Sequence, residues 1–284
     1  MADRAPGPLR VALTHALLAV ATAATLFPVL WVLKMALSPS QSFSMSANPF
    51  PTTFSLVNFT DVMGTTAADG TWLFARQLMN SLVVSGVTAL LGVTLACTAG
   101  YAMSRWEFPG RDRLMGIFLL TQMFPAVVMA IPLYILLDAL HLLDSLTGLV
   151  LVYSTTTIPF ATWNLKGYFD TIPRDLEEAA MLDGASRWVT FTRVILPLAR
   201  PAIVVTGLFA FMTAWNEFIL AATLIGDERS TTLPVVLNGY VGEFDAEWGH
   251  FAAGAMLVSV PVTALFFVLQ RHLVEGLTAG SVKG

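Results

Sequence analysis

Charged residues are scarce in this chain of 284 residues, at 12%, whereas hydrophobic residues make up 56%. Soluble domains carry about a quarter charged residues, so this composition argues against one. A single cysteine, Cys97, excludes an internal disulfide. The net charge is −4 and no basic cluster is present, which argues against nucleic-acid binding. The composition therefore predicts a polytopic membrane protein.

Sequence motifs of an ATPase or a protease are also missing. Only three lysines occur, Lys34, Lys166 and Lys283, and none follows a glycine-rich phosphate-binding loop. The four histidines form no His-Glu-x-x-His pattern and no other metal site. We therefore expect no catalytic residues, no metal and no cofactor on this chain. Any ATP site must lie on another polypeptide.

Six apolar windows have the length of about 20 residues that crosses a bilayer as a helix. They lie at 11–36, 79–103, 114–138, 146–165, 201–225 and 251–273. Prolines inside most windows predict kinks, which membrane helices tolerate because neighbouring helices satisfy the freed carbonyls. The sequence thus predicts an all-α membrane protein with six kinked transmembrane helices in a single domain, 1–284.

The basic residues predict the orientation, because cytoplasmic flanks collect Lys and Arg. With the N-terminus inside, every Lys and Arg faces the cytoplasm except Lys34, Arg76 and Arg229. Both termini are therefore predicted to be cytoplasmic. The polar stretch 38–77 then lies outside, and we expect it to have no core of its own.

The cytoplasmic segment 166–200 is strongly patterned. Pro173 suits a first helical turn, and the acidic residues after it complement the helix dipole. Gly184 can end that helix in a left-handed conformation, Ser186 can cap a second helix, and Pro197 is expected to stop it before the membrane. The segment thus predicts two short helices that form a compact knob, residues 170–190, outside the bilayer.

A long motif runs through this segment: Glu178, Ala179, Ala180, Asp183 and Gly184, then nine residues, Val194, and finally Leu196 and Pro197. It resembles the cytoplasmic loop of permeases of binding-protein-dependent ATP-binding-cassette (ABC) importers, where Val194 is usually Ile. The resemblance implies that the knob docks into a cleft of an ATPase subunit and couples it to transport. The alternative is an amphipathic re-entry helix without a partner.

The resemblance extends to the rest of the chain. Trp215-Asn216-Glu217-Phe218 and the ending Gly280-Ser281-Val282-Lys283-Gly284 look like the MalG-type permeases of maltose and maltodextrin importers, except that Ser281 replaces a glycine. This implies the type I importer architecture and a subunit that forms part of a path for maltose-like oligosaccharides in the cytoplasmic (inner) membrane of a bacterium or archaeon.

The same resemblance implies a set of partners. They are a homologous second permease, two cytoplasmic ATPase subunits that bind ATP and Mg²⁺, an extracytoplasmic sugar-binding protein, and membrane lipid. The tail after Gly276, which we expect to be disordered by itself, is implied to reach the interface between the two ATPases; a solvated end is the alternative. A permease for trehalose, glycerol phosphate or another solute, and an ion-coupled secondary transporter, remain alternative functions.

Two further groups are candidates for contact with substrate or a partner. Glu217 is the only carboxylate well inside a predicted span, so with Asn216 it is expected either to line the translocation path or to fix helix packing. The last outer loop, 226–250, carries Tyr240, Phe244 and Trp248. By resemblance these aromatics contact the sugar-binding protein, whereas their composition alone also suits a membrane interface.

Overall fold

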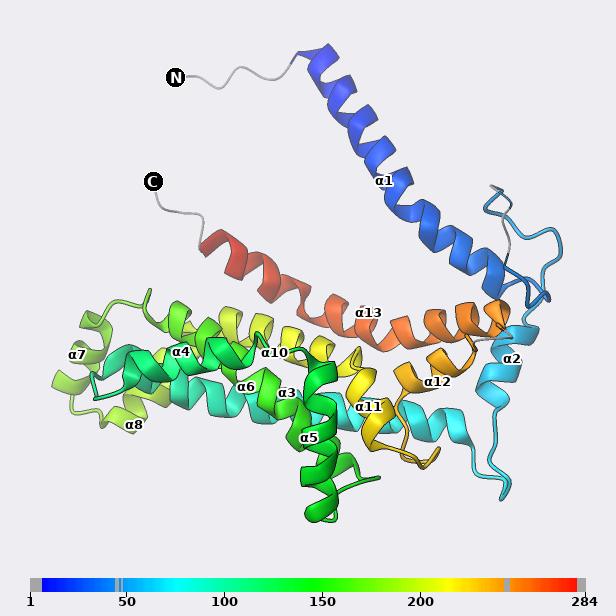
Figure 1. Ribbon diagram of the computed structural model, residues 1–284. Helices are drawn as coiled ribbons and strands as arrows, with labels where there is room; N and C mark the ends of the chain where they lie inside the picture. The colour runs from blue at the N-terminus through cyan, green and yellow to red at the C-terminus, as the bar shows by residue number, and fades with distance from the viewer. Residues whose placement is uncertain (1–6, 44–45, 47, 243–245, 280–284) are drawn as a thin grey trace. The chain divides into compact units, whose positions relative to one another are not determined.

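The computed structural model describes residues 7–43, 46, 48–242 and 246–279, without the side chains of Pro8 and residues 272–279. These residues are helical apart from loops and two isolated β-bridges, Thr66 to Trp72 and Val241 to Ala246. The helices are α1 (Pro8–Ala36), α2 (Val57–Gly64), α3 (Leu73–Arg105), α4 (Arg111–Thr121), α5 (Ala126–Ala139), α6 (Leu146–Phe169), α7 (Asp175–Leu182), α8 (Arg187–Thr190), a π-helical turn (Phe191–Ile195), α9 (Leu196–Leu198), α10 (Arg200–Trp215), α11 (Ile219–Leu224), α12 (Leu233–Gly239) and α13 (Trp248–Ala279) (Figure 1). The predicted all-α fold is confirmed.

Three described helices, α1, α3 and α13, are long and apolar enough to cross a membrane. Two bent pairs, α4 with α5 and the helical run Arg187–Leu198 with α10, raise the number to five if each pair is one span. Helix α6 occupies the remaining predicted window, 146–165, but contains four consecutive Ser and Thr residues and falls short of the others in hydropathy. The helices thus support three to five spans by length and composition.

Two predicted spans are broken rather than kinked. Within the window 114–138, α4 and α5 meet at 101°, and Pro125 lies at the break in an extended conformation. Within the window 201–225, α10 ends at Trp215 and α11 begins at Ile219. At the other end of the chain, α13 continues to Ala279, so the expectation of a disordered tail directly after Gly276 is wrong for residues 277–279.

The described residues fall into two compact units, the first up to Phe74 together with Leu237–Ser259. In this unit the Asn58 side chain is fully buried. Its amide donates to the carbonyls of Ser38, at 2.6 Å, and Ala36, at 3.2 Å, and accepts from Gln41 Nε2 at 2.7 Å. Carbonyls at a helix end lack partners in their own helix, so Asn58 satisfies the end of α1. Asn58 therefore ties the segment 38–77 to the end of α1.

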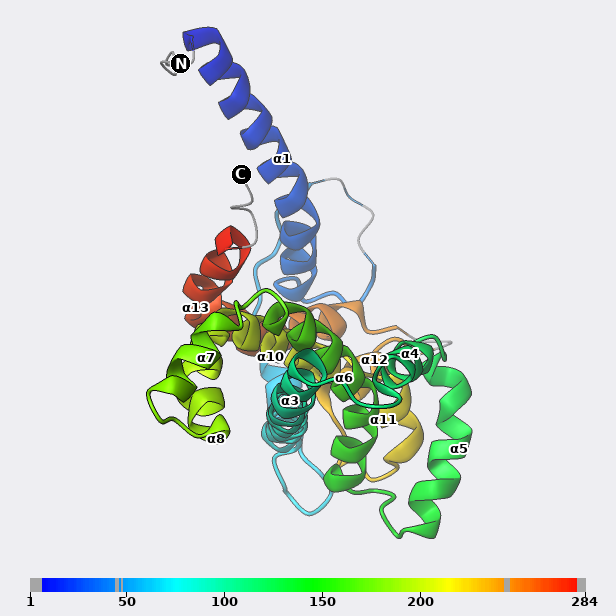
Figure 2. The same cartoon turned by 90° about the vertical axis from the view of Figure 1, so that its left-hand side faces the viewer.

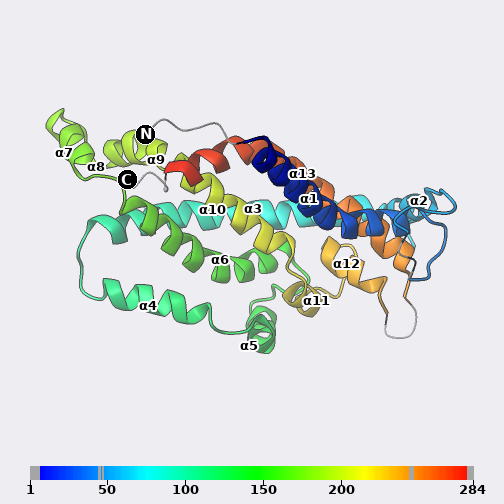
Figure 3. The same cartoon turned by 90° about the horizontal axis from the view of Figure 1, so that it is seen from above.

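The second unit comprises Ala75–Val236 and the chain from Val260. Within it, α6 lies between α10 and α4 (Figures 2 and 3). Helix α3 approaches α6 closely through Gly92 and Gly100: a Cβ atom on Gly92 would lie 2.8 Å from Thr157 Cγ2, and one on Gly100 would lie 3.1 Å from the Lys166 amide nitrogen. Small residues let membrane helices pack closely in this way.

Candidate functional site

The knob folds as its local sequence predicts. Gly184 has a φ of +88°, a left-handed conformation that suits glycine. Its N–H donates to the Met181 carbonyl, and the Ala185 N–H donates to the Ala180 carbonyl, each at 3.0 Å, which closes the end of α7. Ser186 Oγ accepts from the Val189 N–H at 3.3 Å and caps α8.

The second helix of the knob differs from its prediction. After α8 the chain widens into the π-helical turn and then continues as α9 to Leu198, so the helical run ends one residue after Pro197. Proline is tolerated there because it lies in the first turn of α9, where its missing N–H costs little. Leu196 packs against the buried cluster around Ile195, whereas Pro197 is exposed. The chain then bends by 75° into α10.

The motif residues Glu178, Ala179, Asp183 and Gly184 are exposed, and Ala180 is half-buried. Large apolar side chains of the knob are exposed with them: Leu182 is 89% exposed and Trp188 67%, and Leu176 and Met181 are each 43% exposed. Apolar surface of this kind, rimmed by acidic residues, is typical of a protein-binding site. The structure thus leaves most of the motif available to a partner.

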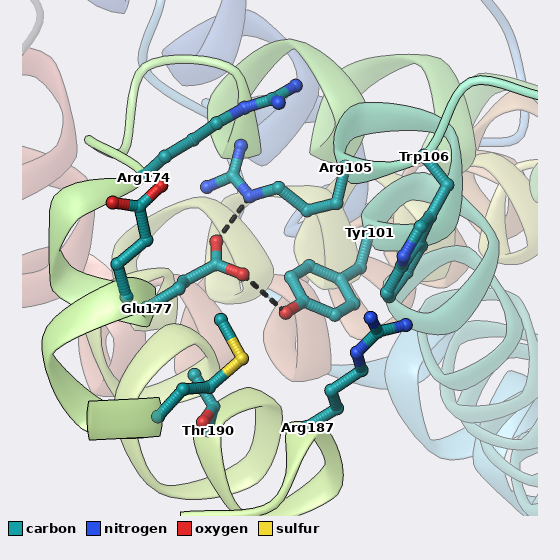
Figure 4. A pocket seen from close by; sticks show the side chains of 9 residues that line it. Tyr101, Arg105, Trp106, Arg174, Glu177, Arg187 and Thr190 are labelled. Carbon is teal, nitrogen blue, oxygen red and sulfur yellow. Dashed lines mark hydrogen bonds and ion pairs between the residues drawn. The ribbon is translucent and has the colours of Figure 1, made fainter. Parts of the chain in front are cut away.

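The neighbouring carboxylate, Glu177, points toward Arg105 and Tyr101 of α3 (Figure 4). Its side chain is buried and forms an ion pair with Arg105 Nε at the C-terminal end of α3. Tyr101 of α3 donates its hydroxyl to the other carboxylate oxygen at 2.7 Å. A second Arg105 nitrogen donates to the Ile172 carbonyl at 3.0 Å. The knob is therefore fastened to α3 through buried polar contacts.

A second polar link joins α3 to the end of α6. Ser104 Oγ donates to one oxygen of Asp170, and Lys166 Nζ to the other, each at 2.7 Å. Partial burial works against ionisation of Asp170, but these two bonds and the positive charges of Lys166 and Arg105 outweigh it and hold the pKa of Asp170 below its ordinary value. Asp170 therefore stays charged at neutral pH.

An open pocket of about 170 Å³ lies beside the buried pair. Arg174, Arg187 and Trp106 line it together with Tyr101 and Thr190 (Figure 4). The Arg187 guanidinium lies 5.9 Å from the centre of the Trp106 ring. Among the described residues, no group of three or more His, Cys, Asp or Glu side chains could hold a metal ion.

Sequence reasoning did not identify Glu177, Arg105 or Tyr101. Glu177 and Glu178 are adjacent acids in the first turn of α7, and both satisfy the helix-dipole argument equally. Only the periodicity of a helix places them on different faces, and that does not say which face is covered. The one sequence signal for this contact was an arginine, Arg105, at the last position of α3. It had been interpreted only as an indication of the orientation of the chain in the membrane.

Glu217 lies in the break between α10 and α11. Its two carboxylate oxygens accept from the N–H groups of Leu220, at 2.9 Å, and Ala221, at 3.1 Å, and from the Tyr153 hydroxyl at 2.8 Å. The side chain thus caps α11 and ties it to α6. Asn216 is exposed, and its amide donates to the Met212 carbonyl of its own helix at 2.8 Å.

The outer-loop aromatics have partners within their own unit. Tyr240 is half-buried, and its ring packs against His250 with centroids 5.6 Å apart; burial raises the pKa of its hydroxyl. Trp248 lies edge-to-face with Phe43, at 5.1 Å, and with Phe251, at 5.9 Å. Phe244 and the tail residues Gly280–Gly284 lie outside the described residues.

Residues 89–278 match a family described as binding-protein-dependent transport system inner membrane component. The maltose/maltodextrin permease MalG of Escherichia coli K12 is 38% identical over 97% of this chain and 96% of its own length. The trehalose permease SugB of Mycobacterium tuberculosis is 37% identical over 91% and 93%, and the diacetylchitobiose permease DasC of Streptomyces coelicolor is 37% identical over 91% and 92%.

Solved structures share the fold. A chain of a bacterial ABC transporter that imports the acidic polysaccharide alginate superimposes with a TM-score of 0.75 at 20% identity, over 95% of this chain and 100% of that one. A chain of the MetNI methionine transporter gives 0.59 at 16% identity, over 72% and 97%. On the family match over most of its length and the identities to these permeases, the chain belongs to the inner membrane components of binding-protein-dependent transport systems.

Proposed function

We propose that the chain is one transmembrane subunit of an ATP-driven importer of oligosaccharides. The observation that carries this proposal is the knob, which keeps Glu178, Ala179 and Asp183 exposed beside large uncovered apolar side chains. The relatives named for maltose, trehalose and diacetylchitobiose favour a sugar. Maltose or a maltodextrin is our first choice of substrate, and trehalose is the alternative.

The proposed subunit spans the cytoplasmic membrane of a bacterium or archaeon six times, with both termini inside. Helices α1, α3 and α13 supply three spans, the two bent pairs supply two, and α6 supplies the sixth. Helix α6 can be less apolar than the other proposed spans because most of its residues are buried or half-buried. The whole chain then acts as a single permease domain.

The proposed partners are a homologous second permease, two cytoplasmic ATPases and an extracytoplasmic sugar-binding protein. ATP and Mg²⁺ bind to the ATPases, whose closure moves the knob. Since α7 packs against α8 and the π-helical turn, and main-chain hydrogen bonds close the end of α7 at Gly184, the knob transmits that movement as a rigid lever to the helices attached to it. The cavity between the two permeases then changes the side on which it opens.

Other parts of the chain receive roles within the same proposal. We assign the border of the translocation path to Asn216, through its exposed amide, and to Glu217, which fixes the break between α10 and α11. The outer loop with Tyr240, Phe244 and Trp248 contacts the sugar-binding protein. The tail Gly280–Gly284 lies at the interface between the ATPases, where a glycine-rich backbone fits a narrow gap.

The substitution Glu178→Lys tests the docking of the knob. An exposed carboxylate that pairs with a partner's arginine becomes a like charge, so ATP-dependent sugar uptake and stimulated ATP hydrolysis should both be lost while membrane insertion stays normal. Gly184→Val should impair coupling too, because a β-branched residue fits a φ of +88° poorly. Normal uptake and ATPase stimulation in Glu178→Lys would overturn the proposal, as would sugar uptake by vesicles without ATP, which would indicate an ion-coupled transporter.

A further inference from the structure

The knob has an attachment to α3 that the motif does not include. Glu177 lies 72 residues from Arg105 and 76 from Tyr101 in sequence, yet its carboxylate bonds both side chains. The side chains of Arg105 and Glu177 are only 6% and 10% exposed. Their ion pair is therefore screened less by water and salt than a pair on the surface.

Further contacts from the knob converge on the same end of α3. Asp170 bonds Ser104, the Arg174 guanidinium lies 3.4 Å from the Ser104 carbonyl, and Arg187 of α8 lies over the Trp106 ring. Aromatic packing adds to these, because the rings of Tyr101 and Phe191 stack with centroids 4.6 Å apart. Every residue from Ser104 to Trp106 thus contacts a residue between 170 and 190.

Geometry limits how these groups can separate. The buried carboxylate of Glu177 has Arg105 and Tyr101 as its partners, and Arg105 in turn binds the Ile172 carbonyl. Moving the knob away from α3 would break the ion pair and the hydrogen bonds of Glu177 and Arg105 together, which is more costly than losing a single surface contact. A displacement of the knob is therefore easier if α3 moves with it than if the pair opens.

We propose that Glu177 is the positioning residue that makes the knob and the C-terminal end of α3 a single moving body. Glu178 faces outward to the partner, and Glu177, one residue earlier, faces inward to the membrane domain. The inference rests on the proposed coupling function for its consequence in transport. The attachment itself is a property of this chain alone.

The first test measures the attachment without any partner. Nitroxide labels are placed on the full-length chain at Asp175→Cys in α7 and Leu95→Cys in α3, two exposed positions, in a Cys97→Ala background. Pulsed EPR should give a narrow distance distribution for the otherwise native chain. Glu177→Gln, which removes the charge but keeps the shape, should broaden it. Glu178→Gln, the matched neighbour, should leave it narrow.

The second test measures the consequence in the complete transporter, with its ATPases and second permease. Glu177→Gln should raise the ATP hydrolysed per sugar imported several-fold, because ATPase closure no longer moves α3 in step. Tyr101→Phe removes only one hydroxyl from the site and should give a smaller rise of the same kind, so misfolding of the first variant does not end the test.

Each outcome is decisive for one of the two ideas. A narrow distribution and a native ratio of ATP to sugar in Glu177→Gln would overturn the attachment. If Glu178→Lys uncouples transport in that case, the docking proposal still stands. If Glu177→Gln broadens the distribution while Glu178→Lys transports normally, the attachment stands and the proposed function fails.

Discussion

Glu217 offers the sharpest test of whether a carboxylate in a predicted span acts through its charge or through packing. Its two oxygens accept three hydrogen bonds, from Leu220, Ala221 and Tyr153. In Glu217→Gln one oxygen becomes an NH₂ group. Whichever way the amide is oriented, one of the two backbone N–H groups at the start of α11 then faces a donor and loses its bond.

The loss of this one hydrogen bond sets the expected loss of stability. A hydrogen bond to a charged group contributes about 1.5–3 kcal/mol, so Glu217→Gln should lower the free energy of unfolding by about that amount. Transport by the folded molecules should stay near normal, since the shape and two of the three contacts remain. Tyr153→Phe is the matched control: it removes one donor and leaves the carboxylate.

Two measurements on purified protein in equal amounts distinguish charge from packing. One is denaturant unfolding of the chain in detergent, and the other is sugar uptake by vesicles reconstituted with the complete transporter. The packing argument requires a loss of stability with uptake retained. An unchanged stability together with abolished uptake in Glu217→Gln would refute it and would show that the charge itself serves the path.

Two other predictions concern α6 and the tail. Gly148→Ala should lower the free energy of unfolding by about 1–3 kcal/mol, because its Cβ would overlap the Leu142 carbonyl oxygen; Gly167→Ala in the same helix has open space and should raise it by about 0.5–1 kcal/mol. Thermal unfolding of both variants checks the opposite signs, and a stable Gly148→Ala would contradict the packing of this turn. Deleting residues 278–284 should weaken the stimulation of ATP hydrolysis by loaded binding protein without preventing assembly; full stimulation after the deletion would show the tail to be dispensable.

The predictions that succeeded rest on short-range signals. A glycine at +88° and a serine cap are set by residues a few positions away, so α7 and α8 can be foreseen from the sequence. The helical class is equally visible in composition. Both depend on interactions within one or two helical turns.

The features that were missed depend on distant residues. Hydropathy windows sum over 114–138 without registering that α4 and α5 meet at 101°. The attachment of the polar segment 38–77 to the end of α1 was missed because Asn58 makes it through hydrogen bonds to main-chain carbonyls, which no apolar pattern signals. The pairing of Glu177 with Arg105 joins positions 72 residues apart, and a single sequence gives no measure of such contacts.

The central position of α6 bears on how the chain is made. Ser154, Thr155, Thr156 and Thr157 bond back to carbonyls of their own helix, which lowers but does not remove the cost of their contact with lipid. Of the proposed spans, α6 is therefore the least able to pass by itself from the translocon into the lipid. Its neighbour α10 emerges from the ribosome only after the knob has been synthesised. We expect α6 to stay beside α3 and α4 during biogenesis and to enter the lipid phase together with the helices that surround it.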